Sequence, residues 1–204
     1  RRGRWLRGWV SVGVPARVGG GWFRGGAGER SGGGVMFGGG GPPACGGVSA
    51  CGGGEAGGGF DTGHGNASLC CHIAVPALEQ GVPPDTISTD LHQRSRMLPN
   101  ATMNITMSKF LALGMPLKEI IYRSTWRPAE VIHRTELGHL SEGAVADVAV
   151  LSLREGDFGF VDATRSVLKA DRQFECQMTL RAGEIVWDLN GHSLPPWEAT
   201  APNA

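Results

Sequence analysis

Three polar residues in the middle of the chain are candidates for chemistry at a strand end. Asp90 follows the strand-like residues 86–89 and stands two residues before His92. An Asp at the carboxyl end of a strand can bind a metal ion or act as a general base. His64 stands between two glycines, which let the backbone approach a ligand and leave the imidazole exposed. These residues alone leave open that Asp90 only forms a turn and that His64 has no role.

The sequence lacks the other common catalytic motifs. It contains no His-x-His, no His-Glu-x-x-His, no Gly-x-Ser-x-Gly and no phosphate-binding Gly-x4-Gly-Lys-Ser/Thr. Its five Cys residues include no Cys-x-x-Cys pair, which favours free thiols in a reducing, cytoplasmic compartment. No apolar run approaches the roughly 20 residues that span a bilayer, so we expect a soluble protein with no membrane partner.

The composition of the chain changes near residue 60. Residues 1–59 hold 24 of the 34 Gly and carry seven Arg against two Glu, whereas the remainder carries 12 basic and 17 acidic residues. The net charge of zero is therefore the sum of two unlike segments, which excludes a nucleic-acid binder that is basic along its whole length. Because glycine raises the entropy cost of ordering and the segment offers little apolar surface, we expect residues 1–59 to be disordered.

Four interpretations of residues 1–59 remain open: a targeting peptide, an Arg/Gly-rich RNA-binding tail, a flexible linker, and sequence that was never selected as protein. The apolar core that a targeting peptide needs is short and interrupted, and only Arg24 begins an Arg-Gly-Gly unit. The segment contains no Asp, Asn, Lys, Ile, Thr, Gln, His or Tyr. This absence favours the fourth interpretation, a G-rich strand translated in the wrong frame or upstream of the true start.

From residue 60 onward, hydrophobic periodicity predicts an α/β segment followed by antiparallel strands. Helices are expected at residues 72–80, 103–113, 116–124 and from 128, the last with Val131 and Ile132 on its inner face. Strands are expected at residues 86–89, 147–153, 173–181 and 184–188. Alternation within 173–181 places Phe174, Cys176, Met178 and Leu180 on one buried face. Ala182-Gly183 is typical of a hairpin turn.

Five segments occur in an order that resembles one enzyme family. They are FDTGHG at 60–65, ISTDLH at 87–92, MSKFLALGMPLKEIIYRSTWRPAEVI at 107–132, LGHLSEGAVADVAVL at 137–151 and TLRAGEIVWDLNG at 179–191. Together they resemble the C-terminal part of the amidohydrolase superfamily, and most closely its dihydroorotase-like amidohydrolase/deacetylase metalloenzymes. The Gly-x-Leu-x-x-Gly-x-x-Ala-Asp element is widespread in the superfamily, whereas DTGHG with STDLH is more specific to the deacetylase-like branch. The resemblance covers residues 60–191.

The resemblance implies an α/β fold: the C-terminal portion of a metal-dependent (β/α)8 TIM barrel, preceded by the disordered Gly-rich segment. Residues 60–136 would form the last two β/α units, 137–191 part of a small β-sandwich, and 192–204 a disordered tail. The implied activity is hydrolysis of a C–N amide bond, in an N-acyl amino acid or a cyclic amide. One or two divalent metal ions, commonly zinc, activate the attacking water in such enzymes.

The resemblance also assigns roles to individual residues. Asp90 matches the Asp at the end of the eighth barrel strand, which binds metal and accepts the proton of the attacking water. His64 and Gly65 match a loop on the substrate side, and His92 matches a group beside the substrate or behind the metal ligands.

Residues 1–59 depart from the family pattern. A complete member supplies His-x-His from its first strand, Lys or Glu from the fourth, and single His ligands from the fifth and sixth, but residues 1–59 contain no His or Lys. A catalytic zinc needs about three protein ligands, so Asp90 by itself is not expected to hold one. Two strands cannot close an eight-stranded barrel. We therefore expect this chain to bind no metal stably and to be inactive alone.

Two alternatives of other classes remain. The chain could be a non-catalytic module completed by a second chain that supplies the missing strands, or a Gly/Arg-rich nucleic-acid-binding protein. Nucleic acid is the weaker partner because the basic excess is confined to residues 1–59. A small-molecule amide is the partner expected for the complete enzyme, and a homo-oligomer stays open.

The interpretation of residues 1–59 predicts the composition of the native protein. Peptide mapping by mass spectrometry is expected to recover peptides from residue 60 onward and none from residues 1–59. Recovery of a peptide from within 1–59 would contradict a mistranslated segment.

Overall fold

The structure is a computed structural model that describes strand residues 10–13 and 49–50 together with residues 60–63, 69–91, 97 and 101–200. Its strands are β1 (Val10–Gly13), β2 (Ser49–Ala50), β3 (Phe60–Thr62), β4 (Thr86–Ile87), β5 (Val148–Val161), β6 (Val167–Arg181) and β7 (Glu184–Asp188). Its helices are α1 (Cys71–Glu79), α2 (Met103–Ala112), α3 (Leu117–Ser124), α4 (Trp126–Val131) and a 3₁₀ helix at Trp197–Thr200.

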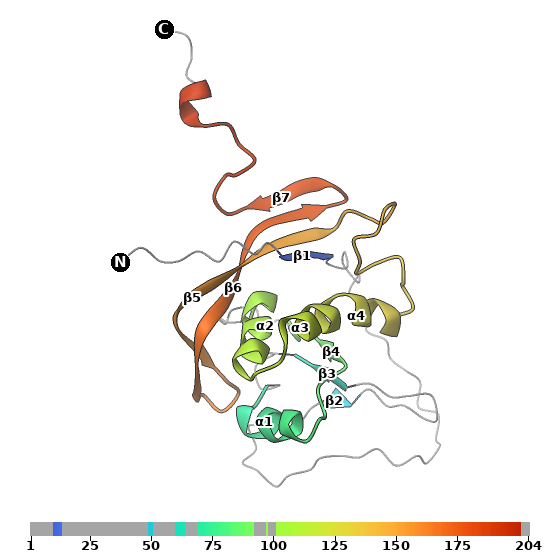
Figure 1. The fold of residues 1–204 in the computed structure, drawn as a ribbon, viewed down its shortest axis with the longest axis vertical. Coiled ribbons are helices and arrows are strands. Elements are labelled where there is room, and N and C mark those ends of the chain that lie inside the picture. Colours follow the sequence, from blue (N-terminus) through green and yellow to red (C-terminus); the bar gives the residue numbers. More distant parts are fainter. Residues whose placement is uncertain are drawn as a thin grey trace.

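The strands form two separate sheets (Figure 1). The larger sheet has the order β1-β5-β6-β7, and all its neighbours are antiparallel. The smaller has the order β2-β3-β4, in which β3 and β4 are parallel and connected through α1. A parallel pair with a helix between its strands is the β/α repeat of a barrel. In the described part of the chain this sheet stays open, so no barrel closes.

Helix α2 joins the two sheets because it packs on β6 and belongs to the same core as β4. The buried core contains Met107 and Phe110 from α2, Phe174 from β6 and Ile87 from β4. Ser108 adds a polar connection: its hydroxyl accepts a hydrogen bond from the backbone N–H of Phe174 at 2.9 Å. The position of β4 is thus set by the same apolar cluster that holds the long hairpin.

The tip of the β5–β6 hairpin is fastened to α1 by Asp162. One carboxylate oxygen accepts hydrogen bonds within the tip, from the backbone N–H of Thr164 at 2.8 Å and of Ser166 at 3.0 Å. The other accepts from the N–H of Cys71, the first residue of α1, at 3.2 Å. Burial works against the charged form of Asp162, but these hydrogen bonds together hold the pKa of its carboxyl group below the usual value.

Lys109 is buried beneath the same tip, with only 1% of its surface exposed. Its ammonium group donates a hydrogen bond to the backbone carbonyl of Val161. Burial lowers the pKa of Lys109 to about 8, while the nearby Cys71 and Asp162 act in the opposite direction. Burial also raises the pKa of the Cys71 thiol, and the charge of Asp162 raises it further.

The predicted element order is confirmed from residue 71 onward. The helices expected at 72–80, 103–113, 116–124 and from 128 correspond to α1 to α4. The expected hairpin at 182–183 is present, and both turn residues have positive φ, 49° at Ala182 and 87° at Gly183. Such angles match the twist of the flanking strands.

The structure corrects several details of these predictions. Val131 and Ile132 are exposed, and Ala129 is the residue of α4 that is fully buried. Gln177, expected on the solvent face of its strand, is only 7% exposed because its amide makes hydrogen bonds with Ser152, Glu175 and Asn190. The two long strands extend beyond the expected ranges, since their pairing continues to Val161 and Val167.

The termini also differ from the prediction of disorder. The residues Val10–Gly13 form a strand paired with β5, and Ser49–Ala50 pair with β3. The β-branched residues of the sequence VSV suit such a strand. In the expected tail 192–204, residues 192–200 are described and include the short 3₁₀ helix. The part of the chain expected in a small β-sandwich forms strands of the sheet β1-β5-β6-β7, which packs against α2.

The low pKa of Lys109 predicts how stability depends on pH. Between about pH 8 and pH 9 the unfolded chain retains a proton that the folded Lys109 has largely lost, so the free energy of unfolding is expected to rise. The gain relative to a Lys109→Met variant is about 1 kcal/mol over that unit. Above pH 9 the raised pKa of Cys71 opposes the trend. Urea unfolding of both proteins at pH 7, 8 and 9 measures this difference, and a constant difference would contradict the assignment.

Candidate active site

The parallel strands β3 and β4 place two chain segments that carry predicted site residues side by side. Asp61 pairs with Thr86, and Thr62 pairs with Ile87. One further backbone hydrogen bond, from Ser88 N–H to the carbonyl of Thr62 at 3.1 Å, extends the pair toward its carboxyl end. Asp90 lies two residues beyond that bond. The expected position of Asp90, just after a strand, is what the structure shows, although β4 itself ends at Ile87.

Carboxylates bridge the two strands at both ends. Near the carboxyl end, Asp61 accepts hydrogen bonds from the hydroxyl groups of Thr86 at 2.6 Å and Ser88 at 2.7 Å. At the other end, Asp85 accepts from the backbone N–H of Phe60 at 2.7 Å. These bonds to charged acceptors are stronger than those between neutral groups. They hold a strand pair that is only three and two residues long.

Asp90 itself has an unusual backbone. Its φ of 47° places it in the left-handed region, which non-glycine residues seldom occupy. Its side chain is exposed and lies against Gly63: a methyl group on Gly63 would meet the Cβ of Asp90 far inside van der Waals contact. The glycine therefore leaves room for the Asp90 side chain at the edge of the strand pair.

The other predicted site residues cannot be placed in the same way. His64, Gly65 and His92 lie outside the described residues. In the described part, no three His, Cys, Asp or Glu side chains form a group that could hold a metal ion. The described residues by themselves consequently do not fit a catalytic metal.

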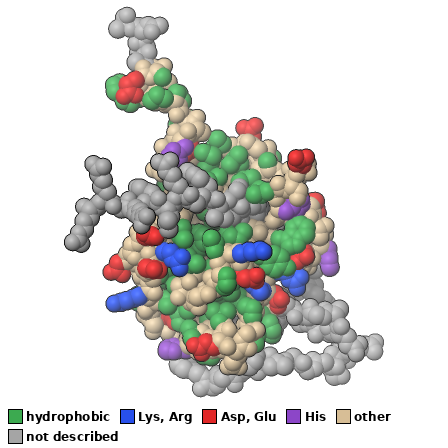
Figure 2. Space-filling model, in the orientation of Figure 1, with side chains coloured by type: hydrophobic (Ala, Val, Ile, Leu, Met, Phe, Trp, Pro, Cys, Tyr) green, Lys and Arg blue, Asp and Glu red, His purple; other side chains and the backbone are tan. Residues whose placement is uncertain are grey.

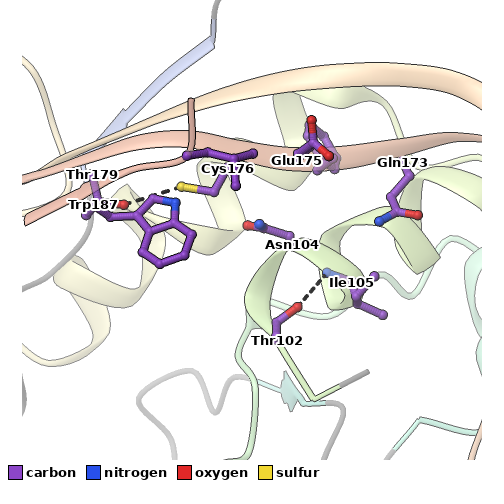
Figure 3. Close-up of a pocket in the computed structure, with 10 residues that line it drawn as sticks. Thr102, Asn104, Ile105, Gln173, Glu175, Cys176, Thr179 and Trp187 are labelled. Carbon is purple, nitrogen blue, oxygen red and sulfur yellow. Dashed lines mark hydrogen bonds between the residues drawn. The ribbon is translucent and has the colours of Figure 1, made fainter. Parts of the chain in front are cut away.

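A separate groove of about 530 Å³ lies between the start of α2 and strands β6 and β7 (Figure 3). Its lining residues are Thr102, Asn104, Ile105, Gln173, Phe174, Glu175, Cys176, Thr179, Trp187 and Leu189. The acid among them is already paired, because Glu175 lies 2.8 Å from the guanidinium of Arg154. Cys176 contacts the Thr179 hydroxyl at 3.3 Å. Asp90, the predicted site residue that the structure describes, does not line this groove.

The Gly-x-Leu-x-x-Gly-x-x-Ala-Asp element, residues 138–147, makes contacts that stabilise the fold. The carboxylate of Asp147, at its end, accepts a hydrogen bond from the N–H of Ala182 in the β6–β7 turn at 2.7 Å. Gly138, at its start, has a φ of 76° and sits so close to Thr125 and Trp126 that no side chain fits. Asp147 thus fixes the start of β5 to the β6–β7 turn, and Gly138 allows the chain to pack closely against the start of α4.

Comparison with known proteins settles the family. Residues 71–186 match the amidohydrolase family. The chain belongs to that family. A deacetylase from Brucella anthropi is 36% identical over 126 residues, which cover 62% of this chain and 31% of the relative. A deacetylase from Enterococcus faecalis is 33% identical over 127 residues, covering 62% of this chain and 34% of the relative.

Solved amidohydrolase-like structures share the arrangement of the chain. An adenine deaminase superimposes with a TM-score of 0.59 at 32% identity, covering 63% of this chain and 35% of the other. A dihydroorotase gives 0.58 at 34% identity, again over 63% and 35%. The chain thus spans about a third of the length of the relatives it matches. The predicted resemblance to deacetylases and dihydroorotases is confirmed at the level of the family.

Sequence analysis missed Asp61 and Gly63 as parts of the site. Both lie within the segment FDTGHG, in which His64 and Gly65 were the predicted site residues. Their importance arises from pairing with a strand about 25 residues away, which no local pattern reveals.

The contact at Gly63 predicts a coupled pair of substitutions. Gly63→Ala is expected to lower the free energy of unfolding by about 1–3 kcal/mol, because the new methyl group overpacks against Asp90. In an Asp90→Gly background the loss should be smaller, since the nearest opposing atom, the Cβ of Asp90, is gone, although the backbone nitrogen of residue 90 and the Ser88 hydroxyl still oppose the methyl group. Urea unfolding of the four proteins forms a double-mutant cycle. Equal losses in both backgrounds would show that Gly63 does not pack against Asp90.

Proposed function

We propose that this chain is the C-terminal part of a metal-dependent amidohydrolase that hydrolyses a C–N amide bond. The substrate class that we propose is an N-acylated amino acid or a cyclic amide. Asp90 is the proposed catalytic residue, a metal ligand and proton acceptor in the complete enzyme. His64, Gly65 and His92 are proposed to lie on the substrate side.

One observation supports this proposal most directly. Asp90 follows the second strand of a parallel β-α-β unit, at the carboxyl edge where barrel enzymes place their catalytic residues. The unit belongs to a chain whose family membership is shown over residues 71–186. The deacetylase names of the sequence relatives favour amide substrates.

Zinc is the proposed metal of the complete enzyme, and the chain alone is proposed to be inactive. A zinc site needs about three protein ligands, and Asp90 is the one proposed ligand among the described residues. Activity would then require metal ligands beyond those in the part of the chain that the structure describes.

A second chain that supplies those strands is the alternative that the surface favours. Several large apolar side chains are exposed, and hydrophobic groups cover much of the face drawn in Figure 2. They include Leu91, Val131, Ile132, Ile185, Val186 and Trp187. Among the described strands, β4 is an edge strand of the small sheet. Exposed apolar side chains and open sheet edges are each typical of surfaces that a partner covers.

The compartment and the assembly are proposals as well. Cys71 and Cys176 are free thiols, which supports a cytoplasmic location. The helices of the described part are all too short or too polar to cross a membrane. A homo-oligomer remains part of the proposal for the complete enzyme.

A chimera tests the proposed function. Residues 60–191 replace the matching third of the Brucella anthropi deacetylase, and amide hydrolysis is measured with zinc present. We expect turnover by the chimera and none by the 204-residue chain alone. Asp90→Asn should lower kcat of the chimera by at least about 100-fold, because it removes a proton acceptor.

Asp171→Asn is the matched control, since it removes the same charge from a side chain that is 89% exposed on β6. The control should keep the turnover of the parent chimera. Equal turnover by the two Asn variants would remove Asp90 from catalysis, and turnover by the isolated chain would contradict its proposed inactivity.

A further inference from the structure

The two carboxylates that bridge β3 and β4 are alike in chemistry but differ in location. Asp61 bridges the strands near their carboxyl end, two residues from Asp90 through its bond to Ser88. Asp85 bridges them at the opposite end, through the backbone of Phe60. This difference in location gives the two groups different tasks.

We propose that Asp61 is a positioning residue that fixes the turn from Ser88 to Asp90 and thereby presents the Asp90 carboxylate at the site edge. The inference rests on the proposed function of Asp90. Asp61 acts through Thr86 and Ser88 and makes no contact with a substrate in this scheme.

The backbone of Asp90 lies in the left-handed region, with a φ of 47°. A non-glycine residue in the left-handed region is strained and persists where its surroundings hold it. Ser88 is held twice: its N–H donates to Thr62 and its hydroxyl donates to Asp61. The turn to Asp90 therefore begins at Ser88, a residue that is fixed by hydrogen bonds of both its backbone and its side chain.

Asp61 binds β4 and the residue after it through both oxygens of its carboxylate. Thr86 donates to one oxygen and Ser88 to the other, at 2.6 Å and 2.7 Å. The hydroxyl groups of Thr86 on β4 and of Ser88, just after it, are thereby both tied to β3. This two-point attachment sets the direction in which the chain leaves β4.

Close steric contact with Gly63 also restricts Asp90. Gly63 follows β3 directly and lies against both Asp90 and the Ser88 hydroxyl. The Asp90 side chain thus packs beside the segment that carries Asp61. Movement of one strand along the other would alter this contact and the orientation of Asp90 together.

The experiment compares Asp61→Ala with Asp85→Ala in the full 204-residue chain. The readouts are the NMR chemical shifts of the Asp90 Cα and side-chain carboxyl carbon, and the amide hydrogen exchange of residues 89–91. Asp61→Ala is expected to move both carbon shifts and to speed exchange about tenfold more than global destabilisation explains, since it removes hydrogen bonds to a charged group.

Asp85→Ala is the control because it removes a carboxylate bridge from the same strand pair without touching Ser88. It should lower stability and leave the Asp90 carbon shifts unchanged. Equal changes at Asp90 in both variants, or none in Asp61→Ala, would overturn the proposal. These readouts need neither metal nor turnover, so they stay separate from the test of amide hydrolysis.

Two milder variants keep the proposal testable if Asp61→Ala does not fold. Ser88→Ala removes the bond nearest Asp90, and Thr86→Val removes the more distant one. Ser88→Ala should shift the Asp90 resonances more than Thr86→Val does. The reverse order would contradict a positioning role for Asp61.

Discussion

The packing of α2 against the β5–β6 hairpin is the contact on which the rest of the structure depends. Phe110 and Phe174 lie at its centre, and Ile87 of β4 belongs to the same buried cluster. The two-residue strand β4 could not hold a fixed position by its own hydrogen bonds, because so short a pair is marginal in water. The apolar core holds it there, and the placement of Asp90 follows.

Two adjacent buried polar residues of α2 reinforce this contact. Ser108 binds the backbone of Phe174, and Lys109 reaches the carbonyl of Val161. Asp162 then carries the connection on to α1. Such groups tolerate little displacement, because an unsatisfied polar atom in a core costs about 1–3 kcal/mol. They make the arrangement of the hairpin and the helices specific where hydrophobic burial alone is not directional.

The chain has the family of a larger group of proteins but only part of their length. The chain belongs to the amidohydrolase family but spans about a third of its relatives. The described part has a buried core and an intact β-α-β unit. It also exposes several large apolar side chains and an open small sheet, features that further chain or a partner commonly covers.

Local sequence determined the elements, and tertiary contacts decided how they form a site. Helical periodicity at residues 103–113 and the Ala182-Gly183 turn predicted α2 and the β6–β7 hairpin, because both depend on neighbours in the chain. The position of Asp90 after a strand was also foreseeable. The bridges made by Asp61, the burial of Lys109 and the exposure of Val131 were not. Each depends on which distant segment lies opposite, and that is settled only when the core packs.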